Sequence, residues 1–309
     1  MINLKKISIG TPKSFLYYRY QILWKYFFEG LGCEVVISDD TTKETLENGK
    51  IYSIDEACLS SKIYLGHVYN LIGKCDYIFI PRIENYGKGE KVCVKFNATY
   101  DIVKNIFPEE KFLDFNIERT KHPSMFINYF KLGLRLTKNP FKILKNYLKA
   151  CNRQKIYNKE LLRKQNSNLN NKKLKILLVT HPYNIYDNYI GTPIVKKLKS
   201  MNIEIIYADR LDHKTAKMYA KQLSPTLYWT YSKELIGAIN YYQYSVDGII
   251  FLTTFPCGPD SLVNELMIRK ITTLPITNII IDELTASAGL ETRLESFVDI
   301  IKERRDHHE

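Results

Sequence analysis

The residues of this chain best suited to chemistry are three cysteines, Cys58, Cys93 and Cys257, each predicted to lie just beyond the end of a strand. Cys257 precedes a helix that the sequence predicts to open at Asp260. The unpaired N–H groups and the positive dipole end of a helix stabilise a thiolate, the form of cysteine that binds soft metals and attacks electrophiles. By spacing alone, the three cysteines fit a 4Fe-4S cluster with one open iron, a zinc site with an open position, or three unrelated core residues.

Alternating strand and helix patterns surround these cysteines. Apolar runs typical of strands occupy residues 5–10, 34–37, 51–54, 76–80, 174–180, 203–207, 248–252 and 277–281, with helical spacing between most of them. This order predicts an α/β fold with two doubly wound parallel-sheet, Rossmann-like domains. The predicted domains are an N-terminal α/β domain (1–110), a basic, mainly helical bridge and linker (111–171) and a C-terminal α/β domain (172–309). Ligands bind such sheets at the carboxyl ends of their strands, where we expect the thiols.

The positive charge of the chain is concentrated in one segment. Of the formal net charge of +12, residues 111–175 contribute 17 lysine or arginine residues against three acidic ones. A segment of this kind suits an acidic protein partner, a phosphate-bearing ligand, nucleic acid or an anionic membrane surface, and it equally suits a solvated helical face. The polar run at 164–171 is predicted to be a linker.

The absence of other signals narrows the class of protein. The chain shows no secretory signal and no run of about 20 apolar residues, so we expect a cytoplasmic protein without a membrane span. Its six cysteines are then not expected to form a disulfide framework. A dinucleotide-binding glycine motif, a P-loop, a close Cys-x-x-Cys pair and a zinc-protease motif are all missing.

Several short motifs in order along the chain resemble the 2-hydroxyacyl-CoA dehydratase D-component-like family, a group also described as CoA-substrate-specific enzyme activase-related. The motifs are Ile9-Gly10-Thr11-Pro12, Leu16-Tyr17-Tyr18-Arg19-Tyr20, Asp55-Glu56-Ala57-Cys58, Gly66-His67, 76–82, His181-Pro182-Tyr183-Asn184, Cys257-Gly258-Pro259-Asp260-Ser261 and Asp282-Glu283. The resemblance covers nearly the whole chain except its basic middle.

The resemblance implies that Cys58, Cys93 and Cys257 ligate a 4Fe-4S cluster. It also implies an ATP-dependent activase with its own iron-sulfur cluster as electron donor, a second cluster-bearing subunit or a homodimer, and an acyl-CoA substrate. Cys33, Cys75 and Cys151 match none of the motifs, which disfavours a double-cubane cluster with additional thiol ligands. The chain has no ATPase signature, so we expect an electron acceptor or a cluster-bearing accessory and not the activase itself.

Four further residues are candidates for a catalytic role: His181, His67, Arg19 and Arg82. The two arginines and His67 are suited to a thioester carbonyl, a phosphate or the edge of a cluster, and His181 to proton donation. Each also has a structural reading as a helix cap, an ion pair or a buried hydrogen bond.

The leading hypothesis is an anaerobic iron-sulfur protein in ATP-activated, low-potential electron transfer or in reductive dehydration of a 2-hydroxyacyl-CoA, as a lyase or as a reductase component. The alternatives are a non-catalytic, cluster-bearing or scaffold partner of a larger reductase and a metal-free module that binds a phosphate ligand. Nucleic acid is not expected as a partner.

Overall fold

The structure, a computed structural model, describes residues 6–122, 124–284 and 287–307. The chain divides into two compact units, residues 1–158 and 159–309. Each unit contains a four-stranded parallel sheet with helices around it, so the predicted fold class is confirmed. The boundary between the units falls inside one long helix, and the predicted three-part division into domains stays a prediction.

The sheet of unit 1 has the strand order β2-β1-β3-β4. Its strands are β1 (Ser8–Thr11), β2 (Glu34–Ile37), β3 (Tyr77–Asn85) and β4 (Phe112–Glu118). Ile9 of β1 lies opposite Val35 on one side and Tyr77 on the other, which places β1 in the interior of the sheet. The helices of unit 1 are α1 (Tyr17–Leu31), α2 (Lys43–Ile51), α3 (Leu59–Tyr69), α4 (Val94–Asn97), α5 (Thr99–Ile106) and α6 (Met125–Leu134).

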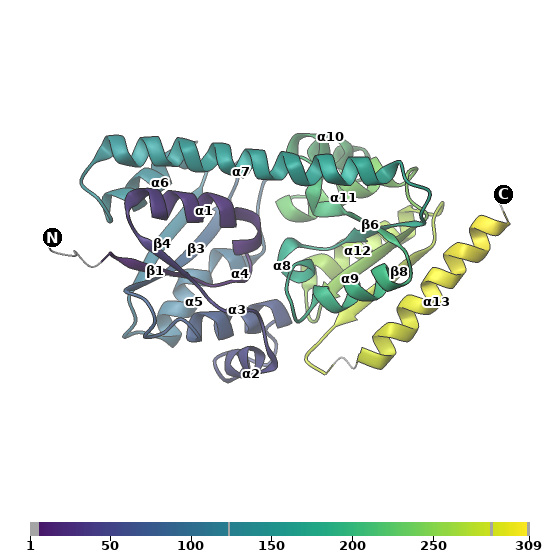
Figure 1. The fold of residues 1–309 in the computed structure, drawn as a ribbon, viewed down its shortest axis with the longest axis horizontal. Helices are drawn as coiled ribbons and strands as arrows, with labels where there is room; N and C mark the ends of the chain where they lie inside the picture. Colours follow the sequence, from purple (N-terminus) through teal and green to yellow (C-terminus); the bar gives the residue numbers. More distant parts are fainter. Residues whose placement is uncertain (1–5, 123, 285–286, 308–309) are drawn as a thin grey trace. The chain divides into compact units, whose positions relative to one another are not determined.

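Aromatic side chains pack α1 and α6 against one face of this sheet. The ring centroid of Phe79 in β3 lies 5.0 Å from that of Trp24 and 5.1 Å from that of Phe28, and Phe115 of β4 lies 4.6 Å from Tyr129 of α6. All five side chains are buried, and large aromatic surfaces contribute strongly to core stability. Helices α3 and α5 lie on the opposite face (Figure 1).

Unit 2 repeats the same strand order with different strands. Its sheet runs β6-β5-β7-β8, with β5 (Lys175–Val179), β6 (Glu204–Tyr207), β7 (Gly248–Thr254) and β8 (Ile276–Ile281). Strand β7 is buried along its whole length, as expected for a central parallel strand. The other elements are α8 (Pro182–Ile185), α9 (Gly191–Ser200), η1 (Ala208–Arg210), α10 (His213–Leu223), α11 (Thr230–Tyr242), α12 (Gly258–Lys270) and α13 (Ser287–Asp306).

The predicted strand at 51–54 is wrong. Helix α2 continues through Ile51, and a turn leads from there towards Cys58. The helix is stabilised at its start by a capping box, in which the Thr42 side chain accepts a hydrogen bond from the N–H of Thr45 and the Thr45 hydroxyl accepts one from the N–H of Thr42. The short run at 51–54 therefore does not form a strand, because its first residue belongs to the capped helix α2.

Two further expectations about the middle of the chain are corrected. Residues 81–85 extend β3 beyond the strand predicted at 76–80, and residues 112–118, which belong to the predicted, mainly helical bridge, form the edge strand β4. Strand β4 alternates buried and half-buried residues next to β3. Pairing with β3 stabilises β4. The local sequence pattern does not show this pairing, so it could not predict the strand.

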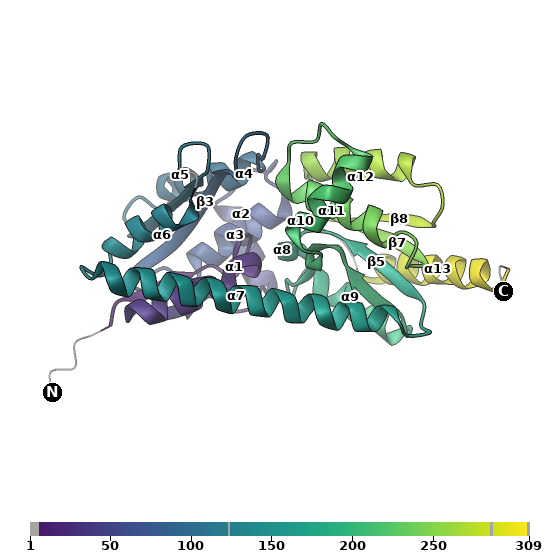
Figure 2. The same ribbon diagram turned by 90° about the horizontal axis from the view of Figure 1, so that it is seen from above.

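The expected linker at 164–171 is largely helix, since α7 (Pro140–Leu169) runs through residue 169. Figure 2 shows α7 as one unbroken helix. Its last turns are anchored by Gln165, which is buried and accepts a hydrogen bond from the N–H of Tyr207 at 2.9 Å. The Gln165 amide also donates to the carbonyl of Tyr207 and the hydroxyl of Tyr242. These tertiary contacts stabilise the helical conformation of residues 164–169, which are mostly polar. Among the described residues, none of the helices has the length and apolarity that a membrane crossing needs.

Candidate functional site

In unit 2, two chemically versatile side chains follow neighbouring strands at the same edge of the sheet. His181 comes two residues after β5 and is the N-cap of α8, and Cys257 comes three residues after β7 and is the N-cap of α12. Strands β5 and β7 pair in parallel, so their carboxyl ends share one edge. This is the edge at which open parallel sheets place their ligands.

His181 is paired with a carboxylate. Its Nε2 lies 2.8 Å from Oδ1 of Asp260, a residue in the first turn of α12, and both side chains are almost fully buried. The imidazole also stacks on Tyr183, with ring centroids 5.1 Å apart. An ionised Asp260 accepts the Nε2–H hydrogen, and this arrangement fixes both the ring orientation and the tautomer.

The other ring nitrogen of His181 is open. In the described part of the chain, the buried Nδ1 has no hydrogen-bond partner. With Nε2–H donated to Asp260, Nδ1 carries a lone pair that is able to accept a proton or bind a metal. A buried polar atom without a partner is costly in free energy and is one of the features by which a functional group is recognised.

The two cysteines of unit 1 also stand at helix starts. Cys58 is the N-cap of α3, and Cys93 is the N-cap of α4. Cys58 was expected to follow a strand and instead follows the turn after α2. Cys93 comes eight residues after the end of β3, and its helix is only four residues long. The Cys58 Sγ lies 3.1 Å from the hydroxyl oxygen of Ser61, one turn along α3.

The remaining three cysteines have a different environment. Burial raises the pKa values of Cys33, Cys75 and Cys151 above their ordinary value, so their thiols remain protonated at neutral pH. The Lys142 ammonium, the backbone at Gly10 and the hydroxyl of Tyr147 oppose this effect only in part. These three cysteines behave as packing residues, although only Cys33 is buried, and Cys75 and Cys151 are half-buried as Cys58, Cys93 and Cys257 are.

The three predicted ligands match a soft metal site in kind. All six cysteines lie in the described part of the chain, and each is a thiol outside any disulfide. Within the described residues, no group of three or more His, Cys, Asp or Glu side chains is placed to hold a metal ion. Cys58 and Cys93 belong to unit 1 and Cys257 to unit 2. The shared site therefore stays a prediction that rests on the chemistry of the donors.

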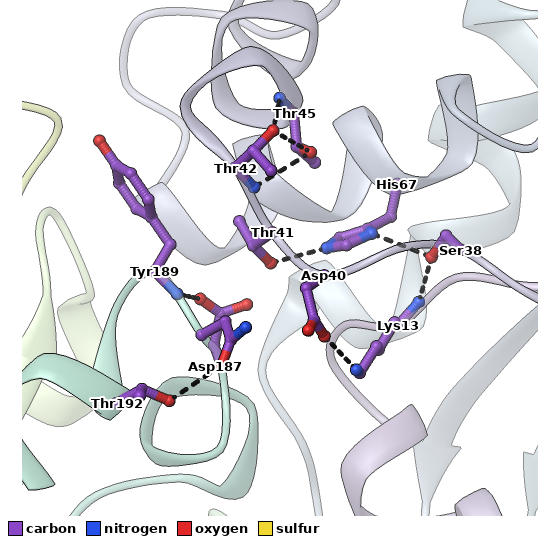
Figure 3. Close-up of polar contacts among 11 residues, drawn as sticks. Lys13, Ser38, Asp40, Thr41, Thr42, Thr45, His67, Asp187, Tyr189 and Thr192 are labelled. Carbon is purple, nitrogen blue, oxygen red and sulfur yellow. Dashed lines mark hydrogen bonds and ion pairs between the residues drawn. The ribbon is translucent and has the colours of Figure 1, made fainter. Parts of the chain in front are cut away.

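His67 is held by hydrogen bonds at both ring nitrogens. Its Nδ1 lies 2.9 Å from the Ser38 hydroxyl and its Nε2 lies 2.9 Å from the Thr41 hydroxyl (Figure 3). Burial, assisted by the positive charge of Lys13 and opposed by Asp40, lowers the pKa of His67 from 6.5 to about 4. The imidazole is therefore neutral at physiological pH and connects α3 to the loop after β2.

The two arginine candidates lie in unit 1. Arg82 of β3 places Nη1 3.2 Å from Oδ2 of Asp101 and Nε 3.7 Å from Oδ1 of Asp114. Burial raises the pKa of Asp114, and the positive charges of Arg82 and Arg135 oppose that rise. Arg82 thus already neutralises two carboxylates. Arg19 is a half-buried residue in the first turn of α1. Catalytic roles for both arginines remain predictions.

Sequence reasoning missed the partner of His181. Asp260 belongs to the motif around Cys257, but its contact with His181 spans 79 residues of chain and depends on the pairing of β5 with β7. One available signal was that His181 directly follows one predicted strand and that Asp260 lies at the predicted start of the helix after another. The position of an acidic residue in a first helical turn was interpreted as helix start chemistry alone.

One family of known proteins matches the chain. The family is described as CoA enzyme activase uncharacterised domain (DUF2229), and its match covers residues 8–211. The match includes all of the sheet of unit 1 and the first two strands of unit 2. No curated protein matches the chain at a significant level.

Proposed function

Because the chain belongs to the CoA enzyme activase uncharacterised domain family, we propose that it is an iron-sulfur component of a CoA-dependent enzyme system, one that receives low-potential electrons from an ATP-dependent activase. The proposed ligands of a 4Fe-4S cluster are Cys58, Cys93 and Cys257. The resemblance to the 2-hydroxyacyl-CoA dehydratase D-component-like family supports this finer assignment. It also suggests reductive dehydration of an acyl-CoA as the reaction that the protein serves, in the cytoplasm.

The observation that carries the proposal is the division of the six cysteines into two classes. Three are N-caps of helices, and the other three lie away from helix starts and have pKa values that burial raises. Cys58 and Cys257 begin helices of 11 and 13 residues, and cysteine side chains are the usual ligands of iron-sulfur clusters. Thiolate is the form that binds iron.

When bound, the cluster supplies one-electron transfer at low potential. The protein supplies the thiolates and a proton-handling pair. His181, oriented by Asp260, is the proposed proton donor or acceptor near Cys257, because its Nδ1 is buried and has no partner in the described chain. Asp260 stabilises the imidazolium that forms when Nδ1 takes up a proton.

Iron and sulfide analysis tests the proposal. Protein purified and reconstituted without oxygen should hold about four iron atoms and about four sulfides per chain. Replacing Cys58, Cys93 or Cys257 by Ala should lower the iron content and the cluster signal in electron paramagnetic resonance. The matched controls are Cys33→Ala, Cys75→Ala and Cys151→Ala, which should retain both. Absence of iron after reconstitution, or an equal loss in the controls, would contradict the proposal.

A second candidate function is a non-catalytic partner of a larger reductase that docks an acidic subunit. It is favoured by the surface of α7, on which most of the eight lysine and arginine residues are exposed and which contains a single glutamate. Acidic surfaces associate with such a helix through long-range attraction. A stable, salt-sensitive complex without acyl-CoA turnover supports this role, and turnover by the chain with an activase alone excludes it.

A further inference from the structure

Unit 1 contains an apolar pocket that no function discussed above uses. Its volume is about 450 Å3, and its walls come from α3, from α5 and from the turn after α2. The lining is mainly apolar, with Phe15, Ile54, Ile102 and Val103 among the contributing side chains. Small-molecule sites typically have volumes of about 300–1,000 Å3 and are lined mostly by apolar groups with a few polar ones. The pocket therefore has the size and character of a binding site.

Three of the six polar side chains of the lining already have hydrogen bonds. The Thr99 hydroxyl donates to the carbonyl of Lys95 at 2.6 Å, and the Ser53 hydroxyl donates to the carbonyl of Lys50 at 3.3 Å. Ser61 contacts the thiol of Cys58. These groups are occupied by the protein itself and are not available to orient a ligand.

Tyr64 and Lys95 are two of the three remaining polar residues of the lining. The hydroxyl of Tyr64 is buried and has no hydrogen-bond partner in the described part of the chain. Burial raises the pKa of Tyr64, so the phenol stays protonated and is a hydrogen-bond donor. Lys95 is half-buried in the wall, and the described residues provide no hydrogen bond or ion pair for its ammonium group. Leaving such groups unsatisfied is costly, by about 1–3 kcal/mol for a buried hydroxyl.

We propose that this pocket binds a small apolar carboxylate, with the carboxylate accepting hydrogen bonds from the Tyr64 hydroxyl and the Lys95 ammonium and the hydrocarbon part against the walls of α3 and α5. A carboxylate has two oxygens that can accept hydrogen bonds from two donors, and charge-assisted hydrogen bonds are stronger than neutral ones. The stacked ring of Phe15, 4.9 Å from Tyr64, fixes the phenol in the wall.

The mouth of the pocket is apolar and open to solvent. Ile51 and Ile54 line it and are 73% and 64% exposed, which is unusual for large aliphatic side chains in the same short turn. Their exposure offers additional apolar contact to an entering ligand. The inference goes beyond the proposed cluster function and requires no metal, so it is tested in metal-free protein.

Calorimetric titration with hexanoate is the test, with hexan-1-ol as the uncharged probe of equal chain length. We expect saturable binding of hexanoate to the wild-type chain and weaker binding of the alcohol. Tyr64→Phe should weaken hexanoate binding about tenfold or more, the size expected for a hydrogen bond to a charged group. Lys95→Met should weaken it about fivefold and remove the preference for hexanoate over the alcohol.

The matched controls are Tyr26→Phe and Lys88→Met, which alter the same residue types elsewhere in unit 1 and should bind as the wild type does. A pocket-filling change, Ile102→Trp, should abolish binding of both probes. Circular dichroism and thermal melting check that each variant folds, and Lys95→Met decides the question if Tyr64→Phe is unstable. The proposal is overturned if the wild-type chain does not bind hexanoate at millimolar concentration. It is also overturned if Tyr64→Phe and Lys95→Met both bind hexanoate with the affinity of the wild type. Neither result depends on the iron content of the protein.

Discussion

The two α/β units have the same strand order, have cysteine at one pair of corresponding helix starts and have different residues at another. In both units the first strand lies between the second and the third, and a packed helix pair connects the second strand to the third. The second helix of that pair begins at Cys58 in unit 1 and at Trp229 in unit 2. The first helix after the third strand begins at Cys93 and at Cys257, respectively. The scaffold thus repeats the positions, and the residue at each position determines the chemistry available there.

The histidines make the same contrast at the level of single side chains. His67 in unit 1 has both ring nitrogens bonded to hydroxyl groups, whereas His181 in unit 2 has one nitrogen on a carboxylate and one without a partner among the described residues. Both rings are buried. Burial therefore does not distinguish a structural histidine from a chemically available one, but a complete account of the hydrogen bonds does.

The largest effect is expected where the shared architecture is tightest. An added Cβ would meet a backbone oxygen at 1.9 Å both at Gly66, against Thr45 of α2, and at Gly237, against Ala216 of α10. Gly66→Ala and Gly237→Ala should each destabilise their own unit by about 3 kcal/mol or more, because backbone atoms must move. Hydrogen exchange measured by mass spectrometry should report the loss in α2 and α3 for the first variant and in α10 and α11 for the second.

Gly289→Ala in α13 is the control, since an added Cβ there meets nothing within 4 Å. It should raise stability by about 0.5–1 kcal/mol through helix propensity. If Gly66→Ala and Gly237→Ala are as stable as this control, the helix pairs do not approach as closely as described.

The next effect concerns His67 and acid. Because its pKa is lowered from 6.5 to about 4, the unfolded chain takes up a proton below pH 6.5 that the folded chain refuses until about pH 4. The free energy of unfolding of unit 1 should therefore fall by about 3 kcal/mol between those pH values. Urea unfolding followed by the fluorescence of Trp24, in a Trp229→Phe background, measures it.

His67→Gln provides the comparison for that experiment, since an amide can hydrogen-bond to Ser38 and Thr41 but does not titrate. Its unfolding free energy should be lower at pH 7 and should vary less between pH 6.5 and pH 4. An unchanged pH dependence in His67→Gln would show that His67 is not the responsible group.

The smallest effects compare one ion pair from each unit. Arg82→Met leaves the half-buried Asp114 without its closest cation and should cost about 2 kcal/mol in unit 1. Arg269→Met removes an exposed pair with Glu265, four residues earlier on α12, and should cost less than about 0.5 kcal/mol in unit 2. Chemical unfolding of the two variants gives both values, and equal losses would contradict the contrast in burial.

Much of the fold was predictable because its signals are local. Apolar runs such as 76–80 and 248–252 correctly indicated central strands, and helical spacing correctly indicated α1, α3 and α9. The misassigned segments depended on neighbours in space. Strand β4 is stabilised by pairing with β3, and the polar end of α7 is held by the contacts of Gln165 with Tyr207 and Tyr242.

The candidate site shows the same division. The sequence by itself determined the α/β class, the position of Cys257 and His181 after strands and the concentration of positive charge in the segment 111–175, since these follow from residue type and order along the chain. Only the tertiary structure decided that Asp260 meets His181, that His67 has both nitrogens satisfied and that Tyr64 and Lys95 line one pocket. Such contacts join residues from separate elements. They depend on how strands pair and helices pack, which local periodicity does not specify.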